Sequence, residues 1–327
     1  MMKKGYVLPI KVLVSGGLLY LLFRGMDMEV FWETVSSVSY GTVLFILLLL
    51  LLVQTLSTLR WHTILTKDYK MPFSRLFSIY FIGMYFNNFL PTLVGGDLVK
   101  AYYIYRETGR GGISLASIFL DRYSGFTALM AITAVATFAG YTLIKGSSIL
   151  WLLLVLLGSF VVMSLVIWID LFHGWAVRLL NRVRLFGINR KIDTFYRALM
   201  GYKSERTILL KVFSLSLVIQ GSIIIGYYIL ARAVGMDIPL HYFFFFVPIA
   251  TVVAMIPLSL AGLGIREGAF VFLFAKAGGS PAEAMSISLL FFFAMLIVSL
   301  IGGVEYLRRG SISMKSVDTM RAMEGKE

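Results

Sequence analysis

Long runs of apolar residues recur along the chain, and polar residues gather between them. Six runs are long enough to cross a bilayer as helices, because a hydrocarbon core about 30 Å thick needs about 20 apolar residues. These runs cover residues 6–23, 41–59, 113–144, 149–169, 209–231 and 282–306. None alternates with a period of two, as a barrel strand would. The pattern predicts an all-α polytopic membrane protein.

Two further apolar regions, residues 74–105 and 242–277, are interrupted in the middle. The interruptions are Pro91, Gly95 and Gly96 in the first region and Pro257, Gly262 and Gly264 in the second. Half-length helices on either side of such a break are typical of a re-entrant hairpin, which enters and leaves the membrane on one side. We therefore predict six transmembrane helices plus two re-entrant helical hairpins.

The two broken regions also share a spacing. In each, a proline is followed by a glycine five residues later and by a basic residue nine residues later. These residues are Pro91, Gly96 and Lys100 in the first region and Pro257, Gly262 and Arg266 in the second. Secondary transporters often build a midplane site from such repeats in inverted orientation. Proline, glycine and an interfacial base are also common at any helix break, so coincidence stays open as the alternative.

Basic residues orient these elements through the positive-inside rule. With both termini in the cytoplasm, the cytoplasmic segments are residues 1–5, 60–75, 100–112, 170–207 and the tail from Arg308. They hold 22 of the 30 Lys and Arg residues, and the outside loops hold four. The first hairpin then opens to the cytoplasm and the second to the outside. We predict one transmembrane domain over residues 1–310 and a short cytoplasmic tail over residues 311–327.

Composition supports the membrane class and narrows the chemistry. The chain has 59% hydrophobic and 14% charged residues, whereas a soluble globular chain has about 25% charged residues. It contains no cysteine and only three histidines, which excludes disulfides and argues against metal or nucleophile sites. The net charge of +13 is explained by topology, so we expect no nucleic acid, no metal and no cofactor.

The first hairpin carries two charged residues beside its glycines. Asp97 follows Gly95 and Gly96, where it could cap the returning half-helix or contact a ligand. Lys100 lies one turn further on, and a lysine beside the free amides of a helix N-terminus makes a phosphate site. Alternatively, Lys100 is an interfacial cation on an apolar stem.

Arg122 is an intramembrane cation. It lies nine residues into the run 113–144, roughly 13 Å deep at about 1.5 Å per residue. Adjacent Asp121 points about 100° away on a helix, so Arg122 needs another partner. The two candidates are Asp97, as a structural partner, and a lipid phosphate, as a functional ligand. We favour the lipid phosphate, because intramembrane charges usually mark a functional site.

The second hairpin places Arg266 and Glu267 at the start of its returning half-helix. Arg266 could hold an anionic headgroup by two hydrogen bonds, and Glu267 could pair with it. The predicted headgroup-binding residues are therefore Lys100, Arg122 and Arg266. The predicted coupling or structural partners are Asp97, Asp121 and Glu267.

Three secondary features complete the pattern. The basic loop 170–207 is predicted to form one or two helices on the anionic cytoplasmic surface. The amides Gln54 and Gln220 and the glycine pairs Gly16–Gly17 and Gly302–Gly303 are interpreted as helix contacts.

The order of these motifs resembles a known family. The motifs are, in order, Pro91-Thr-Leu-Val-Gly-Gly-Asp97-Leu-Val-Lys100, Asp121-Arg122, and Ile256-Pro257 through Gly262-Leu-Gly264-Ile-Arg266-Glu267-Gly268. In this order and spacing they resemble the motifs of the flippase-like family named for the transmembrane region of lysylphosphatidylglycerol synthase. The likeness extends to about Gly310. Lys100 stands where the family usually has arginine, and Asp121 where it usually has glutamate.

The resemblance implies a lipid transporter in a prokaryotic cytoplasmic (inner) membrane, acting on a phospholipid or an isoprenoid-linked headgroup. We expect no aminoacyltransferase domain after Glu327, so the synthase activity is not carried over. No nucleotide-binding loop is present, which leaves proton or sodium coupling or a downhill lipid gradient. The alternatives are an integral-membrane enzyme acting on lipid-linked substrates and a non-transporting accessory subunit. The oligomeric state stays open.

Overall fold

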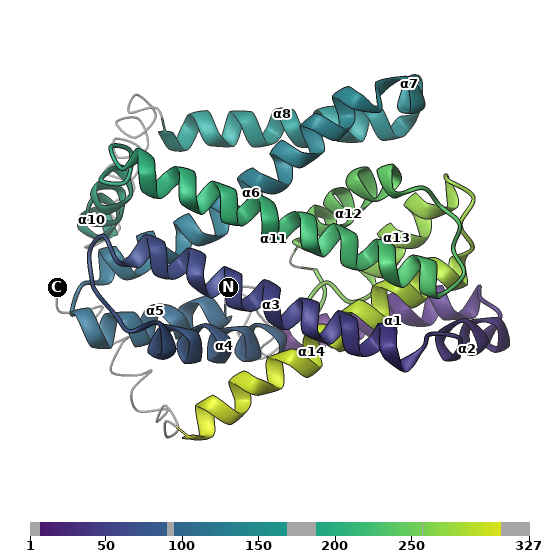
Figure 1. The fold of residues 1–327 in the computed structure, drawn as a ribbon, viewed down its shortest axis with the longest axis horizontal. Coiled ribbons are helices and arrows are strands. Elements are labelled where there is room, and N and C mark those ends of the chain that lie inside the picture. Colours follow the sequence, from purple (N-terminus) through teal and green to yellow (C-terminus); the bar gives the residue numbers. More distant parts are fainter. Residues whose placement is uncertain (1–6, 90–94, 169–187, 257, 309–327) are drawn as a thin grey trace.

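The computed structural model describes residues 7–89, 95–168, 188–256 and 258–308, and all regular secondary structure in these ranges is helical (Figure 1). Pro91, Pro257, most of the basic loop and the tail lie outside the described residues. The long helices are α1 (Val7–Arg24), α3 (Tyr40–Leu65), α6 (Gly111–Ala139), α8 (Ser148–Trp168), α11 (Arg206–Ala233) and α14 (Pro281–Arg308). They correspond to the six runs of the sequence.

Five of these helices are long and apolar enough to cross a membrane, counted over the described ranges: α3, α6, α8, α11 and α14. Their outer faces are apolar as well. On α8, for example, Trp151 and Val155 are exposed, which water would disfavour and lipid accepts. The chain is therefore a multi-pass membrane protein, with α1 as a further apolar helix outside that set of five.

The predicted run 113–144 is divided in two, because α6 ends at Ala139 and a short helix, α7 (Tyr141–Ile144), follows Gly140. A side chain at Gly140 would lie 2.6 Å from Cζ of Phe245. Glycine therefore lets the ring of Phe245 pack against this turn, and the long helix stops there.

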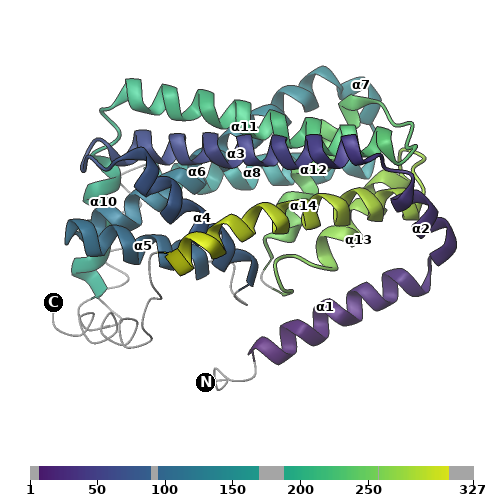
Figure 2. The same ribbon diagram turned by 60° about the horizontal axis from the view of Figure 1, so that its bottom comes forward.

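The shorter helices lie beside and between the long ones. They are α2 (Met28–Ser36), α4 (Phe73–Phe89), α5 (Gly95–Thr108), α10 (Ile188–Met200), α12 (Leu240–Ala254) and α13 (Ile265–Ala275). The helix α4 packs against α5, and α12 packs against α13. These are the two broken regions of the sequence. The pairs lie toward opposite ends of the long axis of the molecule (Figure 1 and Figure 2).

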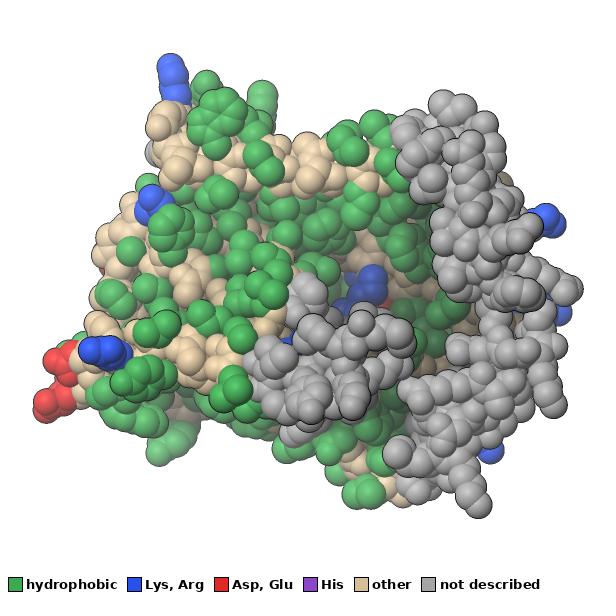
Figure 3. All heavy atoms as spheres, turned by 180° about the vertical axis from the view of Figure 1, so that it is seen from behind, with side chains coloured by type: hydrophobic (Ala, Val, Ile, Leu, Met, Phe, Trp, Pro, Cys, Tyr) green, Lys and Arg blue, Asp and Glu red, His purple; other side chains and the backbone are tan. Residues whose placement is uncertain are grey.

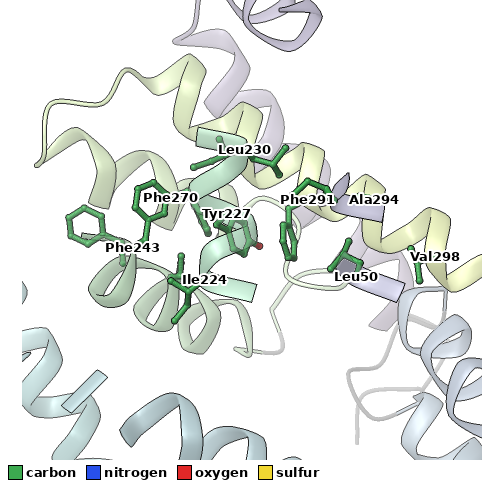
Figure 4. Packing of buried hydrophobic residues seen from close by; sticks show 14 of the residues in the cluster. Leu50, Ile224, Tyr227, Leu230, Phe243, Phe270, Phe291, Ala294 and Val298 are labelled. Carbon is green, nitrogen blue, oxygen red and sulfur yellow. The ribbon is translucent and has the colours of Figure 1, made fainter. Parts of the chain in front are cut away.

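The core is formed where α3, α11 and α14 meet (Figure 1). Figure 4 shows Tyr227 of α11 between Phe270 of α13 and Phe291 of α14. The ring of Tyr227 stacks on Phe291 with centroids 3.9 Å apart and lies 4.9 Å from Phe270. Aromatic packing of this kind fixes helices in lipid, where apolar burial alone gives little driving force.

Gly302 brings the backbones of α14 and α4 into direct contact. A side chain at this position would lie 1.9 Å from the carbonyl oxygen of Phe81. The interpretation of Gly302 as a helix-contact residue is thus confirmed, as is that of Gln220, whose Nε2 donates to the carbonyl of Gly125 at 3.0 Å. For Gly16 and Gly17 the interpretation is wrong, because a side chain at either position would meet nothing within 4 Å. The Nε2 atom of Gln54 lies 3.3 Å from the sulfur of Met295.

Helices α3–α6 and α11–α14 have the same order and similar spacing. α11 begins 166 residues after α3, α12 begins 167 after α4, and α13 and α14 begin 170 after α5 and α6. Their contacts also correspond, if each helix is exchanged for its counterpart. The contacts α3–α4, α4–α5, α5–α6, α4–α14, α3–α14 and α3–α6 match α11–α12, α12–α13, α13–α14, α12–α6, α11–α6 and α11–α14.

Helix α1 lies along one edge of the molecule and contacts α13 of the second broken region (Figure 2). The hydroxyl of Ser15 accepts a hydrogen bond of 2.8 Å from the amide of Leu260. A side chain at Gly264 would lie 2.6 Å from Cβ of Leu18. The break of the second region is therefore held partly by α1.

The described part of the basic loop contains the predicted helix, α10, and its apolar residues face the protein. Phe195 packs edge-on against Phe119 of α6 at 5.6 Å, and Leu199 and Tyr202 are buried. The Tyr202 hydroxyl donates to Asp68 at 2.6 Å. Burial, followed by the hydrogen bond and charge of Asp68, raises the pKa of Tyr202 above its usual range, so the phenol stays a donor.

Candidate functional site

Arg122 of α6 is paired with Asp97 of α5, the structural one of its two candidate partners. Its Nε lies 2.9 Å from Asp97 Oδ2, and its Nη2 lies 3.0 Å from Asp97 Oδ1. This bidentate geometry fixes both groups. The side chain of Arg122 is 53% exposed, whereas that of Asp97 is 12% exposed. The pair therefore leaves part of the guanidinium accessible and keeps its carboxylate covered.

Asp97 lies in the first turn of α5 and does not cap it. The helix begins at Gly95, and the amide of Gly96 donates to Oδ1 of Asn87 at 2.8 Å. A side chain at Gly96 would lie 1.8 Å from the carbonyl oxygen of Gly83. Gly83 and Gly96 thus let α4 and α5 touch. Because the side chain of Asn87 accepts from the amide of Gly96, the Asp97 carboxylate is free to bind Arg122.

Lys100 is buried and does not face the outside of the bundle. Its Nζ lies 3.5 Å from Asp97 Oδ1, and its side chain is 4% exposed. The ammonium lies 3.9 Å from the ring centre of Tyr80 and 5.4 Å from that of Trp61. These rings and one carboxylate replace the water that a lysine normally keeps, which argues against an interfacial lysine.

Asp121 is paired with Arg60, which the sequence analysis assigned to a cytoplasmic segment. In the structure Arg60 does not begin a loop, because α3 continues to Leu65, and the side chain of Arg60 is buried. Its Nε donates to Asp121 Oδ1 at 2.8 Å, and its Nη1 donates to Ser216 of α11 at 3.0 Å. This pair joins α3, α6 and α11, and both side chains are less than 10% exposed.

The second broken region contains a closed pair of Arg266 and Glu267. Glu267 is fully buried, and its Oε1 accepts from Arg266 Nη2 at 2.5 Å, from Arg266 Nε at 3.1 Å and from Ser288 at 3.0 Å. Its Oε2 accepts from the amide of Gly264 at 2.6 Å. The Arg266 side chain is 14% exposed and lies 4.8 Å from the ring centre of Phe292.

The backbone before this pair is in an uncommon conformation. Ala261, Gly262 and Gly264 have φ angles of 47°, 78° and 85°, in the region that favours glycine. The two glycines explain why the turn can place Glu267 back under its own helix start, where it accepts from a free amide.

The predicted residues therefore form two clusters and one separate pair. Asp97, Lys100 and Arg122 meet at the first broken region, Arg266 and Glu267 meet at the second, and Asp121 lies with Arg60. Figure 3 shows a hollow in one face of the molecule where basic side chains lie with an acidic one, among hydrophobic neighbours. Of the three predicted headgroup residues, Arg122 is the one that is widely exposed.

Two pockets lie elsewhere on the described surface. One, of about 730 Å³, is apolar and lies between α6, α11 and α12. The other, of about 610 Å³, lies between α4 and α14 beside Arg75 and Arg308, whose guanidinium groups pair with Glu107 and Glu305. Within the described ranges, no group of three or more histidine or acidic residues is placed to bind a metal.

Sequence reasoning missed Arg60, Ser288 and the aromatic residues around Lys100. One signal was present, since a carboxylate adjacent to Arg122 but on another helix face needed its own cation. Ser288 carried a weaker signal. It follows Arg122 by 166 residues, as Arg266 follows Lys100, and both Arg122 and Ser288 bind the carboxylate of the preceding hairpin.

Comparison with known proteins gives consistent matches over most of the chain. The family model described as lysylphosphatidylglycerol synthase TM region matches residues 9–303. Two relatives from Methanothermobacter thermautotrophicus, each described as a UPF0104 membrane protein, are 26% and 25% identical to the chain. The first alignment covers 85% of this chain and 88% of the relative, and the second covers 78% and 80%. The chain therefore belongs to the lysylphosphatidylglycerol synthase transmembrane region family.

Proposed function

We propose that this protein is a lipid flippase or transporter that moves an anionic headgroup, phospholipid or polyprenyl-linked, across the cytoplasmic membrane. The observation that carries the proposal is a half-exposed arginine, Arg122, which a buried carboxylate holds in the middle of an apolar helix bundle. Such a guanidinium is costly in a membrane unless an anion uses it. A lipid phosphate fits this requirement, because its tails can stay in the bilayer.

The two broken helix pairs act as oppositely oriented re-entrant hairpins of an inverted repeat in this proposal. The matching order, spacing and contacts of α3–α6 and α11–α14 support it, as does the position of the pairs toward opposite ends of the molecule (Figure 1). The repeat thus extends well beyond the three-residue spacing in the sequence. Alternating access follows if one hairpin opens to the cytoplasm and the other to the outside.

The three cations have unequal roles in this function. Arg122 makes the direct contact with the headgroup, because it is exposed. Arg266 and Lys100 are covered in this arrangement, so Arg266 would reach a headgroup only after the second hairpin moves. Asp97, Asp121 and Glu267 remain the candidate groups for coupling to protons or sodium, and a downhill lipid gradient would need none of them.

Liposomes containing a fluorescent phosphatidylglycerol test the function. We expect reconstituted protein to speed the exchange of labelled lipid between leaflets, and Arg122→Ala to lower that rate at least tenfold. Arg232→Ala is the matched control, because Arg232 is an exposed arginine paired with Asp237 outside the hairpins. Exchange no faster than in empty vesicles would contradict the transport function. An Arg122→Ala rate equal to that of the control would contradict the assigned site.

Single-cysteine labelling tests the hairpin topology, since the chain has no native cysteine. In intact cells or right-side-out vesicles, Lys145→Cys and Lys276→Cys should react with a membrane-impermeant maleimide, and Arg182→Cys should react only after permeabilisation. If Lys276→Cys also required permeabilisation, the second hairpin would be a full crossing and the inverted orientation would be wrong.

A further inference from the structure

We propose that Asp97 is an exchangeable internal anion that occupies the headgroup position on Arg122. When a lipid phosphate displaces it, Lys100 is the counter-ion that keeps Asp97 paired. This inference rests on the proposed lipid transport and assigns Lys100 a positioning role in place of direct headgroup contact.

The charge balance of the first cluster is the first argument. Asp97 contributes one negative charge, and Lys100 and Arg122 contribute two positive charges. The other two clusters, Arg60 with Asp121 and Arg266 with Glu267, are neutral. An uncompensated charge is unfavourable in a membrane. The first cluster has a net charge of +1 and therefore needs one further anion, whereas the two neutral pairs need none.

The geometry of Arg122 is the second argument. Asp97 occupies Nε and Nη2, which is the edge that a phosphate would also engage with two parallel hydrogen bonds. A guanidinium has five N–H donors, so Nη1 can take the first phosphate oxygen while Asp97 is still bound. Exchange can then proceed without a stage in which Arg122 has no partner.

The position of Lys100 is the third argument. Its Nζ is within 3.5 Å of Asp97 but is enclosed by Tyr80 and Trp61. A side chain at Gly83 would lie 2.6 Å from Cγ of Lys100, so the stem is packed along its length. Lys100 is therefore close enough to hold a displaced Asp97 and too covered to follow the headgroup.

The second hairpin provides an internal comparison. Glu267 already accepts four hydrogen bonds, and its position is fixed by the amide of Gly264. Removing it from Arg266 would leave a fully buried carboxylate short of partners. Exchange is thus confined to the first hairpin, although Lys100 and Arg266 occupy corresponding positions.

Binding of dihexanoyl phosphatidylglycerol to detergent-solubilised protein, measured by calorimetry, tests this exchange. Lys100→Met makes the cluster neutral and leaves Asp97 wholly on Arg122, so we expect the Kd to rise at least tenfold. Asp97→Asn removes the competing anion and should lower the Kd at least threefold. The double variant Lys100→Met/Asp97→Asn restores a net charge of +1, and its Kd should return to the wild-type value or below.

Rescue in the double variant distinguishes exchange from a merely structural role of Lys100. If the double variant binds as weakly as Lys100→Met, the exchange is wrong. If Lys100→Met does not fold, as judged by gel filtration, Asp97→Asn alone decides, and an unchanged or higher Kd overturns the inference. Arg122→Ala tests the proposed function separately, since wild-type affinity in that variant would contradict the headgroup site itself. Inorganic phosphate binding as tightly as the lipid would contradict the lipid assignment and leave the exchange intact.

Discussion

Replacing Gly96 with alanine is expected to prevent the first hairpin from closing. The new Cβ would lie 1.8 Å from the carbonyl oxygen of Gly83 and 2.7 Å from Cγ of Asn87. A backbone carbonyl cannot rotate away as a side chain can, so α4 and α5 must separate. Overpacking of a core usually costs about 1–3 kcal/mol, and a clash between backbones should exceed about 3 kcal/mol.

Thermal unfolding in detergent, followed by far-UV circular dichroism, measures this effect. Gly221→Ala is the matched control, because Gly221 is also helical and a side chain there would meet nothing within 4 Å. That control should be neutral or stabilising, since alanine is favoured over glycine in helices by about 1 kcal/mol. Equal unfolding temperatures for the two variants would show that α4 and α5 are not in the described contact.

Replacing Arg60 with methionine is expected to destabilise the bundle by about 3–5 kcal/mol, because it leaves Asp121 buried without its cation. The Asp121 side chain is 4% exposed, so water cannot replace the guanidinium. The double variant Arg60→Met/Asp121→Leu removes both charges and should recover most of the loss, as buried ion pairs often can be replaced by apolar residues.

Chemical unfolding in mixed micelles gives the comparison. Arg75→Met removes an arginine from the exposed pair with Glu107 and should change the free energy of unfolding by less than about 1 kcal/mol. If Arg60→Met behaves like Arg75→Met, then the contact of Arg60 with Asp121 and Ser216 contributes little to the joining of α3, α6 and α11.

Much of the fold was predictable because lipid leaves the backbone few choices. The six long runs correspond to α1, α3, α6, α8, α11 and α14, and the broken regions correspond to α4–α5 and α12–α13. The pairing of Arg122 with Asp97 was also predictable, since a deep cation needs an anion and few were available. Helix ends were less predictable. The stop at Gly140 depends on the ring of Phe245, which is more than 100 residues away in the sequence.

The site was predicted less completely, because burial of a charge depends on tertiary contacts. In the sequence, Arg60 follows an apolar run and resembles an arginine at the membrane boundary. Its burial becomes evident only from its tertiary contacts with Asp121 of α6 and Ser216 of α11. Lys100 resembles a headgroup ligand until Tyr80 and Trp61 cover it. The repeat was visible as only three matching positions, since helix spacing and contacts can be conserved in a fold while most side chains differ.

The contact between Phe81 and Gly302 also bears on the order in which the molecule is assembled. The two residues are 221 positions apart, and ribosomes add about 5–20 residues per second. Helix α4 therefore waits about 10–45 s after its own synthesis before α14 can pack against it. All residues of the first ion cluster exist by residue 122, but α4 reaches its final contacts only when α14 arrives. The site is thus completed late in biogenesis, although it lies in the first half of the chain.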